Sequence, residues 1–384
     1  IYLHIANLIL KYSSFGIKPI IFQPKIIAKY GYPAEAHTVK TADGYLLTMH
    51  RIPHSNKGKP ADGRPRPPIF LQHGLLGSSA DWIVRGPHKA LAYILSDSGY
   101  DVWMGNARGN TYSRSHMGYY DLPAEINHVL NVTNQTDLIY VGHSMGTTMF
   151  YVLASTRPEY TPKIRAMFSL APVAFMARVK SPIRFLAPFA EDIDFVLNFL
   201  GDGEFLPQNK IIKFLSRYGC ELATIEKEIC ENIIFAIVGF DSSQFNQALL
   251  PIVLGHFPAG SSTKTVLHYA QEIRSGKFQM YDYGAEKNMK RYGTSKAPEY
   301  DLNAIQVPIS LHYSLNDWLA NVDDVKLLYH RLPNTIGKYR VSLPQFNHLD
   351  FLWANDIEKL LFNNLLYLIN KEAFRPGNST DSRL

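Results

Sequence analysis

A serine stands between two glycines in the stretch GHSMG at residues 142–146. An apolar run, DLIYV (137–141), precedes it, and a second apolar run, TTMFYVLAS (147–155), follows it. The first run is typical of a buried strand and the second of a helix, so the serine lies where a strand turns into a helix. In that context G-x-S-x-G predicts a nucleophile elbow, a sharp and strained turn that presents a serine hydroxyl. The alternative is an ordinary turn in which Ser144 only caps the helix.

A serine hydroxyl is a weak nucleophile without a base, and the base needs a carboxylate to orient it. In hydrolases with such an elbow, the acid and then the histidine follow the serine along the chain, each just past a strand. Asp317 follows the predicted strand VPISLHY (307–313), and His348 follows the last predicted strand, KYRVSL (338–343). We therefore predict Asp317 as the acid and His348 as the base. Other residues compete for these two roles. Asp323 and Asp324 are expected as helix caps, His312 inside a strand and His330 on the surface of a helix. His256 and His268 are expected in an inserted segment.

Acyl transfer also needs N–H donors for the oxyanion that develops on the substrate. One donor is the backbone N–H after the nucleophile, which belongs to Met145. The other comes from the loop after an early strand, here LQHGLLGSS (71–79). Its glycines, Gly74 and Gly77, let the backbone face the site, so we predict the amide of Leu75 as the second donor. The alternative is that HGLLG is only a tight turn between a strand and a helix.

Alternating strands and helices must position these loops. Strand-like runs are followed by runs with apolar residues at helical spacing, which predicts right-handed crossovers and a mostly parallel sheet. Asp121 is expected as the N-cap of one helix, with Pro123 in its first turn. The predicted strands are 45–53, 68–74, 100–109, 137–142, 163–173, 307–313 and 338–343, and the predicted helices are 88–100, 121–131, 147–155, 323–332 and 356–370.

This alternation of strands and helices stops after Pro172 and resumes only at residue 307. The stretch between them is far too long for a loop, and it holds apolar, helix-prone runs without clear strands. We therefore predict an inserted, mainly helical cap. The expected organisation is an N-terminal segment (1–28), a core (29–175 and 306–372), a cap with a lid (176–305) and a C-terminal tail (373–384).

Composition narrows the class of protein. Hydrophobic residues make up 46% of the 384 residues and charged residues 19%, so a large core is expected. The net charge of +6 is spread along the chain without a Lys/Arg-rich run, which argues against a nucleic-acid partner. No apolar run reaches the roughly 18 residues that span a bilayer, so a soluble protein is expected. The opening IYLHIANLIL fits the end of a signal sequence or an amphipathic segment packed on the body.

Two cysteines, Cys220 and Cys230, are too few and too far apart for a metal site built from C-x-x-C pairs, and we expect no metal. A disulfide between them would fit an oxidising compartment, and two unrelated buried thiols fit the residues equally well. N-glycosylation sequons begin at Asn131, Asn134 and Asn378 and favour the secretory route.

Ten stretches in chain order resemble the acid lipase family, which includes the gastric and lysosomal acid lipases and their insect relatives. They cover residues 29–368 and read YGYPAEAHTVKTADGYLLTMHRIP, FLQHGLLGSSADW, SGYDVWMGNARGNTYSR, YDLPAEI, YVGHSMGTT, LAPVA, GFDSSQFN, HFPAGSS, SGKFQMYDYG and FNHLDFLWA. The resemblance implies an α/β-hydrolase fold with a cap and a mobile lid. It also implies a secreted or lysosomal enzyme without a cofactor that hydrolyses triacylglycerols or cholesteryl esters at a lipid–water interface.

Carried onto this sequence, the resemblance gives Ser144 as nucleophile, Asp317 as acid and His348 as base. It gives the amides of Leu75 and Met145 as oxyanion donors, and a disulfide in the lid region between Cys220 and Cys230. One departure concerns residues 113–120, where the family has a further segment rich in Trp and Phe. Its absence predicts less apolar cover on one side of the sheet, a groove beside 113–122, and lower stability or activity.

The residues and the resemblance leave two classes of function open. The first is a serine hydrolase that cleaves neutral lipid esters through an acyl-enzyme. The second is a catalytically impaired lipid-binding or storage protein on the same scaffold. Carriers of this kind commonly lose the nucleophile or the base, and all three catalytic candidates are present here, which favours the hydrolase. A hydrolase with an aspartate nucleophile conflicts with Ser144 at the elbow.

Overall fold

The computed structural model describes residues 23–58, 66–110, 121–189, 204–205, 237–249, 252–253 and 255–375. A sheet of eight strands runs through them in the order β1-β2-β4-β3-β5-β6-β9-β10. The pairs β1–β2 and β2–β4 are antiparallel, and the other neighbours are parallel. The strands are β1 (Glu35–Lys40), β2 (Leu46–Ile52), β3 (Pro68–Gln72), β4 (Asp101–Met104), β5 (Leu138–His143), β6 (Ile164–Leu170), β9 (Ile309–Tyr313) and β10 (Thr335–Arg340). The predicted, mostly parallel sheet is confirmed.

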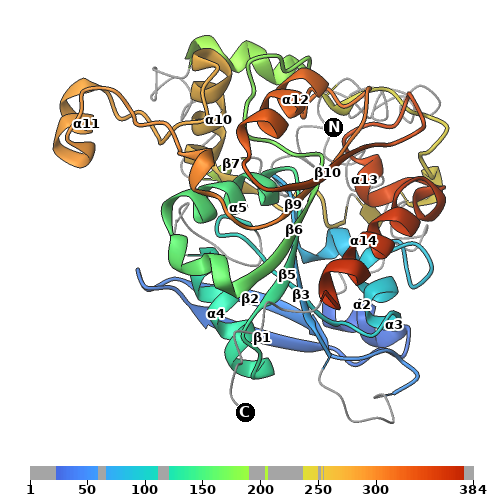
Figure 1. Ribbon diagram of the computed structural model, residues 1–384. Helices are drawn as coiled ribbons and strands as arrows, with labels where there is room; N and C mark the ends of the chain where they lie inside the picture. Colours follow the sequence, from blue (N-terminus) through green and yellow to red (C-terminus); the bar gives the residue numbers. More distant parts are fainter. Residues whose placement is uncertain are drawn as a thin grey trace, which may run out of the picture.

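Helices cover both faces of this sheet. Figure 1 shows α4 and α5 on one side and α3 and α14 on the other. The flanking elements are α2 (Gln23–Lys29), η1 (Ser79–Trp82), α3 (Leu91–Asp97), α4 (Asp121–Thr133), α5 (Met145–Thr156), η2 (Pro158–Lys163), η5 (Leu302–Ala304), α12 (Val322–Arg331), α13 (Asp350–Trp353), η6 (Glu358–Phe362) and α14 (Asn363–Ala373). No helix within the described ranges is long and apolar enough to cross a membrane.

The core lies around the parallel strands. Every residue of β3, β4, β5 and β9 is buried, as expected for strands that helices cover on both faces. Large aromatic side chains fill the space, with the rings of Phe70 and Phe150 at centroid distances of 5.6 Å and 5.3 Å from the ring of Tyr140. Ile27 of α2 is buried in the same core, so packing against the body of the sheet begins ahead of residue 29.

Between β6 and β9 the structure describes parts of the predicted cap. They are η3 (Pro182–Phe189), β7 (Glu204–Phe205), η4 (Gln247–Leu249), β8 (Ser261–Ser262), α10 (Thr263–Ser275) and α11 (Ala285–Tyr292). The two-residue strands β7 and β8 pair with each other, and no described strand of this region joins the main sheet. In Figure 1, α11 stands out from the body on a long arm.

One strand was missed, and two local predictions are wrong. The strand β1 was not predicted, because its residues EAHTVK are mostly polar and every second one is exposed. The strand expected at 338–343 is β10, which begins and ends three residues earlier. Asp121 is not an N-cap. It is the first residue of α4, and its carboxylate accepts hydrogen bonds from the backbone N–H and the guanidinium of Arg108.

The N-terminus of α12 also differs from expectation. Asn321 is the N-cap, and its side chain accepts a hydrogen bond from the backbone N–H of Asp323. Asp323 and Asp324 lie inside the first turn, where negative charge is favoured by the helix dipole. The carboxylate of Asp324 binds Arg178 instead of capping the helix.

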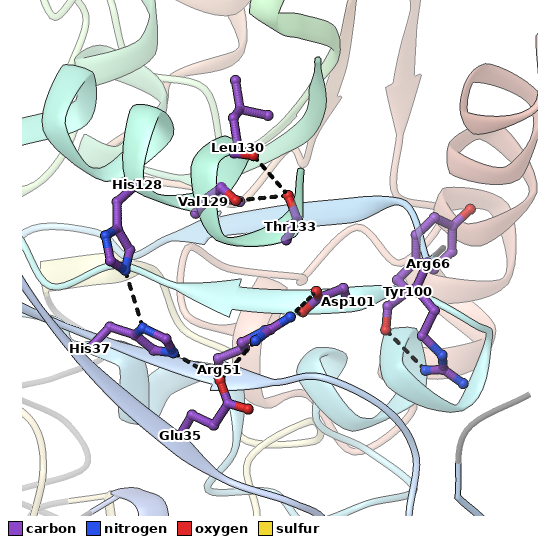
Figure 2. Close-up of polar contacts among 10 residues, drawn as sticks. All are labelled: Glu35, His37, Arg51, Arg66, Tyr100, Asp101, His128, Val129, Leu130 and Thr133. Atoms are coloured by element: carbon purple, nitrogen blue, oxygen red, sulfur yellow. Dashed lines mark hydrogen bonds and ion pairs between the residues drawn. The ribbon is translucent and has the colours of Figure 1, made fainter. Parts of the chain in front are cut away.

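A chain of polar contacts ties α4 to the antiparallel end of the sheet (Figure 2). Arg51 binds both carboxylate oxygens of Asp101 at 2.8 Å and 2.6 Å, and it also binds Glu35 at 2.9 Å. Glu35 lies 2.9 Å from Nε2 of His37, whose Nδ1 lies 3.1 Å from Nε2 of His128 on α4. These bonds hold the helix that precedes β5, the strand that leads to Ser144.

Candidate active site

Ser144 lies between β5 and α5 with φ 51° and ψ −117°. Few residues other than glycine adopt such a backbone, and it costs on the order of 1–3 kcal/mol. Four bonds hold it. The N–H of Ser144 donates to the carbonyl of Leu170, and the carbonyl of Ser144 accepts from the N–H and the hydroxyl of Thr147 and from the N–H of Thr148. The Ser144 side chain makes no capping hydrogen bond with α5. The alternative of a simple helix cap is therefore wrong, and the predicted elbow is present.

The two glycines that flank the elbow are required because a Cβ at either position would collide with neighbouring backbone atoms. A Cβ at Gly142 would lie 2.8 Å from the carbonyl carbon and oxygen of Gly146, and one at Gly146 would lie 2.3 Å from the carbonyl oxygen of Gln72. Both obstacles are backbone, which cannot swing away as a side chain can. The hydroxyl of Tyr140 also donates to the carbonyl of Gly146 at 2.8 Å. The end of β3 therefore lies directly against the start of α5.

The loop after β3 passes beside the serine. A Cβ at Gly74 would lie 3.0 Å from Cβ of Ser144, and Leu75 follows immediately. Met145 opens α5, where backbone N–H groups have no partner within the helix. Among the described residues, neither the N–H of Leu75 nor that of Met145 donates a backbone hydrogen bond. The N–H groups of both predicted oxyanion donors thus lie beside Ser144, and neither donates a backbone hydrogen bond among the described residues.

His73 helps to position the loop beside Ser144, and this role was not predicted from the sequence. Its Nδ1 donates to the carbonyl of Gly74 at 2.7 Å, and its Nε2 accepts from the N–H of Ala107 at 3.0 Å. The ring is completely buried, which lowers its pKa to about 4 and keeps it neutral. His73 thereby ties the loop beside Ser144 to the loop after β4. The sequence held only a weak signal for this role, a histidine just before the first glycine of the loop.

Asp317 and His348 are brought together as predicted. Nδ1 of His348 lies 2.8 Å from Oδ2 of Asp317, and both side chains are buried. The other oxygen of Asp317 accepts from the backbone N–H groups of Leu319 at 2.9 Å and Ala320 at 2.7 Å. These donors stabilise a buried carboxylate. A proton on Nδ1 then leaves Nε2 of His348 free to accept one.

A second histidine joins this pair to the elbow. Nε2 of His143, the residue before Ser144, donates to the backbone carbonyl of His348 at 2.9 Å, and the two rings lie 4.9 Å apart. Burial lowers the pKa of His143 well below its usual value, so the ring is neutral with its proton on Nε2. The histidine loop is therefore fixed to the turn that carries the serine. No role for His143 was predicted from the sequence.

The competing histidines lie elsewhere. His312 is inside β9 with Nε2 2.9 Å from the hydroxyl of Ser310, and His330 is exposed on α12 as expected. His256 and His268 belong to the cap region, and Nε2 of His268 donates to the carbonyl of Gln279. None of these bonds connects them with Asp317.

Two predicted glycosylation residues are exposed at the end of α4. Asn131 lies in its last turn, and Asn134 follows the helix with φ 52°. The hydroxyl of Thr133 donates back to the carbonyls of Val129 and Leu130 (Figure 2). Cys220, Cys230, Asn378 and the short connection at 113–120 lie outside the described residues.

A buried Asp–His pair beside a serine elbow, on a mostly parallel sheet, defines an α/β hydrolase. Two family models match the chain: "Partial alpha/beta-hydrolase lipase region" at residues 23–86 and "alpha/beta hydrolase fold" at residues 67–355. Among solved structures, an esterase from Exiguobacterium antarcticum is 13% identical with a TM-score of 0.52, covering 88% of this chain and 100% of its own. An epoxide hydrolase from Vigna radiata is 14% identical with a TM-score of 0.52, covering 88% of this chain and 98% of its own. These two structures support the fold.

Curated relatives define the family more narrowly. Lipase 3 of Drosophila melanogaster is 42% identical over 91% of this chain and 93% of its own length. Human lysosomal acid lipase/cholesteryl ester hydrolase is 38% identical over 90% of both chains, and bovine gastric triacylglycerol lipase is 39% identical over 91% of both. The chain belongs to the acid lipase family.

Proposed function

We propose that this protein hydrolyses carboxylic esters of neutral lipids, triacylglycerols or cholesteryl esters, through an acyl-enzyme on Ser144. The observation that carries the proposal is the buried hydrogen bond of 2.8 Å between His348 and Asp317, in a loop bonded to the serine elbow through His143. The names of the lysosomal and gastric relatives support the substrate class.

In this mechanism, Nε2 of His348 takes the proton of the Ser144 hydroxyl as its oxygen attacks the ester carbonyl carbon. The N–H groups of Leu75 and Met145 stabilise the oxyanion. The tetrahedral intermediate collapses, the alcohol leaves with the proton from His348, and the acyl group stays on the serine oxygen. A water molecule, deprotonated by His348, then releases the fatty acid and restores the hydroxyl. Asp317 remains ionised throughout and holds the Nδ1–H tautomer.

The cap, with the boundaries 176–305, is proposed to cover the acyl chain above Ser144, and the lipid–water interface is the proposed partner surface. We also propose passage through the secretory route to a secreted or lysosomal location, with glycans on Asn131 or Asn134. The exposure of both side chains at the end of α4 supports this. A disulfide between Cys220 and Cys230 would restrain the lid and remains a prediction.

The test compares wild type with Ser144→Ala on emulsified triolein and on cholesteryl oleate, at pH 5 and pH 7. Fatty-acid release should fall to the uncatalysed background in the variant, with an unchanged circular dichroism spectrum and unfolding temperature. Ser155→Ala on the same helix is the matched control and should keep wild-type activity. Wild-type protein that binds both lipids without releasing fatty acid would favour the lipid-binding alternative. Full activity in Ser144→Ala would reject the assignment of the nucleophile.

A further inference from the structure

Residues 257–262 of the cap region lie against the loop that carries Leu75, one of the two predicted oxyanion donors. The N–H of Ala259 donates to the carbonyl of Leu76 at 2.6 Å, and Ala259 is 1% exposed. Leu76 has φ 62°, in the left-handed region that costs an ordinary residue about 1–2 kcal/mol. A buried hydrogen bond from the cap therefore supports a strained residue that directly follows Leu75.

Two peptide groups connect this hydrogen bond with the N–H of Leu75. A trans peptide points its carbonyl and its N–H in opposite directions, so the group that offers the Leu76 carbonyl to Ala259 presents the N–H of Gly77 on its other side. That N–H donates to the carbonyl of Gly74 at 3.1 Å. The same geometry then directs the N–H of Leu75 away from the carbonyl of Gly74. A chain of hydrogen bonds thus runs from the cap to the oxyanion donor.

The carbonyl of Gly74 has a second support. Nδ1 of His73 donates to it at 2.7 Å, and Nε2 of His73 accepts from the N–H of Ala107. The direction of the Leu75 N–H therefore depends on two bonds to one carbonyl, and one of them leads back to the cap. Bonds in such a chain also polarise one another, by about 10–30% per bond, which makes the last N–H a stronger donor.

The loop after β4 holds the segment 257–262 from another side. Gly109 has φ +90°, and a Cβ there would lie 2.7 Å from the backbone nitrogen of Ser262. A Cβ at Gly260, where φ is +86°, would lie 3.3 Å from the carbonyl oxygen of Gly109. Backbone of the cap therefore lies directly against the loop that His73 joins to the one after β3.

Both ends of the segment are anchored. The ring of Phe257 packs edge-on against Trp353 of α13, with 5.6 Å between the ring centroids. At the other end, Ser261 and Ser262 form β8, which pairs with β7, and α10 begins at the next residue. Ser261 and Ser262 are 5% and 2% exposed. A buried segment that is fixed at both ends can keep Ala259 in place.

We propose that the backbone N–H of Ala259 positions the oxyanion hole, because it holds the two peptide groups that direct the N–H of Leu75. This inference rests on the proposed function. Without that bond, Leu76 relaxes from its strained backbone and the N–H of Gly77 turns away from Gly74. The N–H of Leu75 then keeps only the support that His73 provides. Because the oxyanion develops in the transition state, the loss falls on kcat and spares the binding of the substrate.

The experiment places L-lactate at position 259 of the full chain, which exchanges the N–H of Ala259 for an oxygen and keeps the shape of the residue. With p-nitrophenyl butyrate at pH 7, kcat should fall about tenfold with little change in KM, since a whole oxyanion donor is worth about 10²–10³. L-lactate in place of Ala285 is the matched control, because an N–H at the first position of α11 has no partner within the helix. It should keep the wild-type kcat.

Two inhibitors separate positioning from general damage. Octyl trifluoromethyl ketone adds to an active serine and forms an oxyanion, whereas octyl methyl ketone only occupies the site. The inhibition constant of the first should rise about tenfold in the lactate protein, in step with kcat, and that of the second should not change. Gly109→Ala, which pushes Ser262 away, should show the same pattern. Gly99→Ala, with φ +100° and nothing within 4 Å, should behave like wild type.

A folded lactate protein with wild-type kcat overturns the proposal. An equal loss of affinity for both ketones also overturns it, because the whole substrate site is then disturbed. If the lactate protein fails to fold, the ratio of the two inhibition constants in Gly109→Ala decides. Each of these results leaves the assignment of Ser144 intact, because Ser144→Ala tests that separately.

Discussion

The serine elbow and the loops of Asp317 and His348 are held by different kinds of contact. At the elbow, backbone lies against backbone, and glycine is the residue that fits at 142 and 146. The loops of the acid and the base are instead held by their own side-chain amides and backbone N–H groups, which donate to three backbone carbonyls of the segment 238–240. The sheet therefore fixes the nucleophile, whereas the base is fixed jointly by the sheet and the cap. Changes in the cap should act on the base and spare the elbow.

The largest effect is expected from Gly146→Ala. The new Cβ would lie 2.3 Å from the carbonyl oxygen and 2.9 Å from the carbonyl carbon of Gln72, so β3 and α5 must separate. We expect a loss of on the order of 4 kcal/mol or more in the free energy of unfolding, seen in urea titrations or as insoluble protein. The control is Gly293→Ala at the end of α11, where φ is +73° and nothing lies within 4 Å. It should cost about 1–2 kcal/mol. Equal losses in the two variants would contradict the tight packing of the elbow.

Asp317→Asn should keep the fold and lose catalysis. An asparagine no longer holds the Nδ1–H tautomer of His348, and kcat should fall about 10⁴-fold, as in other serine hydrolases with this change. The measurement is kcat for a soluble ester, with the unfolding temperature taken in parallel. Asp323→Asn, on the exposed face of α12, should leave kcat unchanged. A fall of less than tenfold in Asp317→Asn would mean that another group orients the base.

Gly239→Ala tests the contact between the cap region and the loop that carries Asp317. The Cβ would lie 2.1 Å from the carbonyl oxygen of Asn316, but this segment lies outside the main sheet and can yield without disrupting it. We expect kcat to fall about 10- to 100-fold while the unfolding temperature changes little. Gly284→Ala, with φ +84° and nothing within 4 Å, should not affect kcat. A variant that unfolds like Gly146→Ala would show that the two regions are not held differently.

The smallest effect concerns the stability of the whole molecule at different pH values. Burial raises the pKa of Asp81 and Asp350 to about 8 and also raises that of Glu125 and Glu272. The stability that such groups contribute is full below about pH 4 and is lost as the pH rises toward 8. Buried histidines act in the opposite direction, because their contribution is lost as the pH falls from about 6.5 toward 4. They are His50, His73 and His268 with a pKa of about 4, and His312 with a pKa of about 3.

Above pH 6.5, only the carboxyl groups of this set still titrate. The unfolding temperature should therefore fall by about 2 °C or more between pH 6.5 and pH 8, followed by calorimetry. Asp81→Asn should reduce that fall, since its amide stays neutral at both pH values. An unfolding temperature that rises over this interval would contradict the buried, protonated state of these carboxyl groups.

Sequence patterns were most informative where structure is local. GHSMG, its flanking apolar runs and the chain order of Ser144, Asp317 and His348 predicted the elbow and the Asp–His pair. Ser144 directly follows a buried strand, and Asp317 and His348 lie in the loops after the last two strands. The strand β1 was missed because a half-exposed antiparallel strand has no apolar run.

The roles of His73 and His143 were missed for a different reason. Their partners, Ala107 and His348, lie 34 and 205 positions away along the chain. No spacing rule connects residues so far apart, and a buried histidine resembles an ordinary core residue in a sequence. The same holds for the link between the segment 238–240 and the base.

Reaction of the intact protein with a fluorophosphonate probe at pH 6 tests most directly whether Ser144, Asp317 and His348 act together. The probe reacts only with a serine that a base activates. Tandem mass spectrometry should find one adduct, on Ser144, and His348→Ala should slow its formation by about 10³-fold or more. An adduct on another serine, or labelling of Ser144 at the wild-type rate in His348→Ala, would contradict the proposed catalytic arrangement.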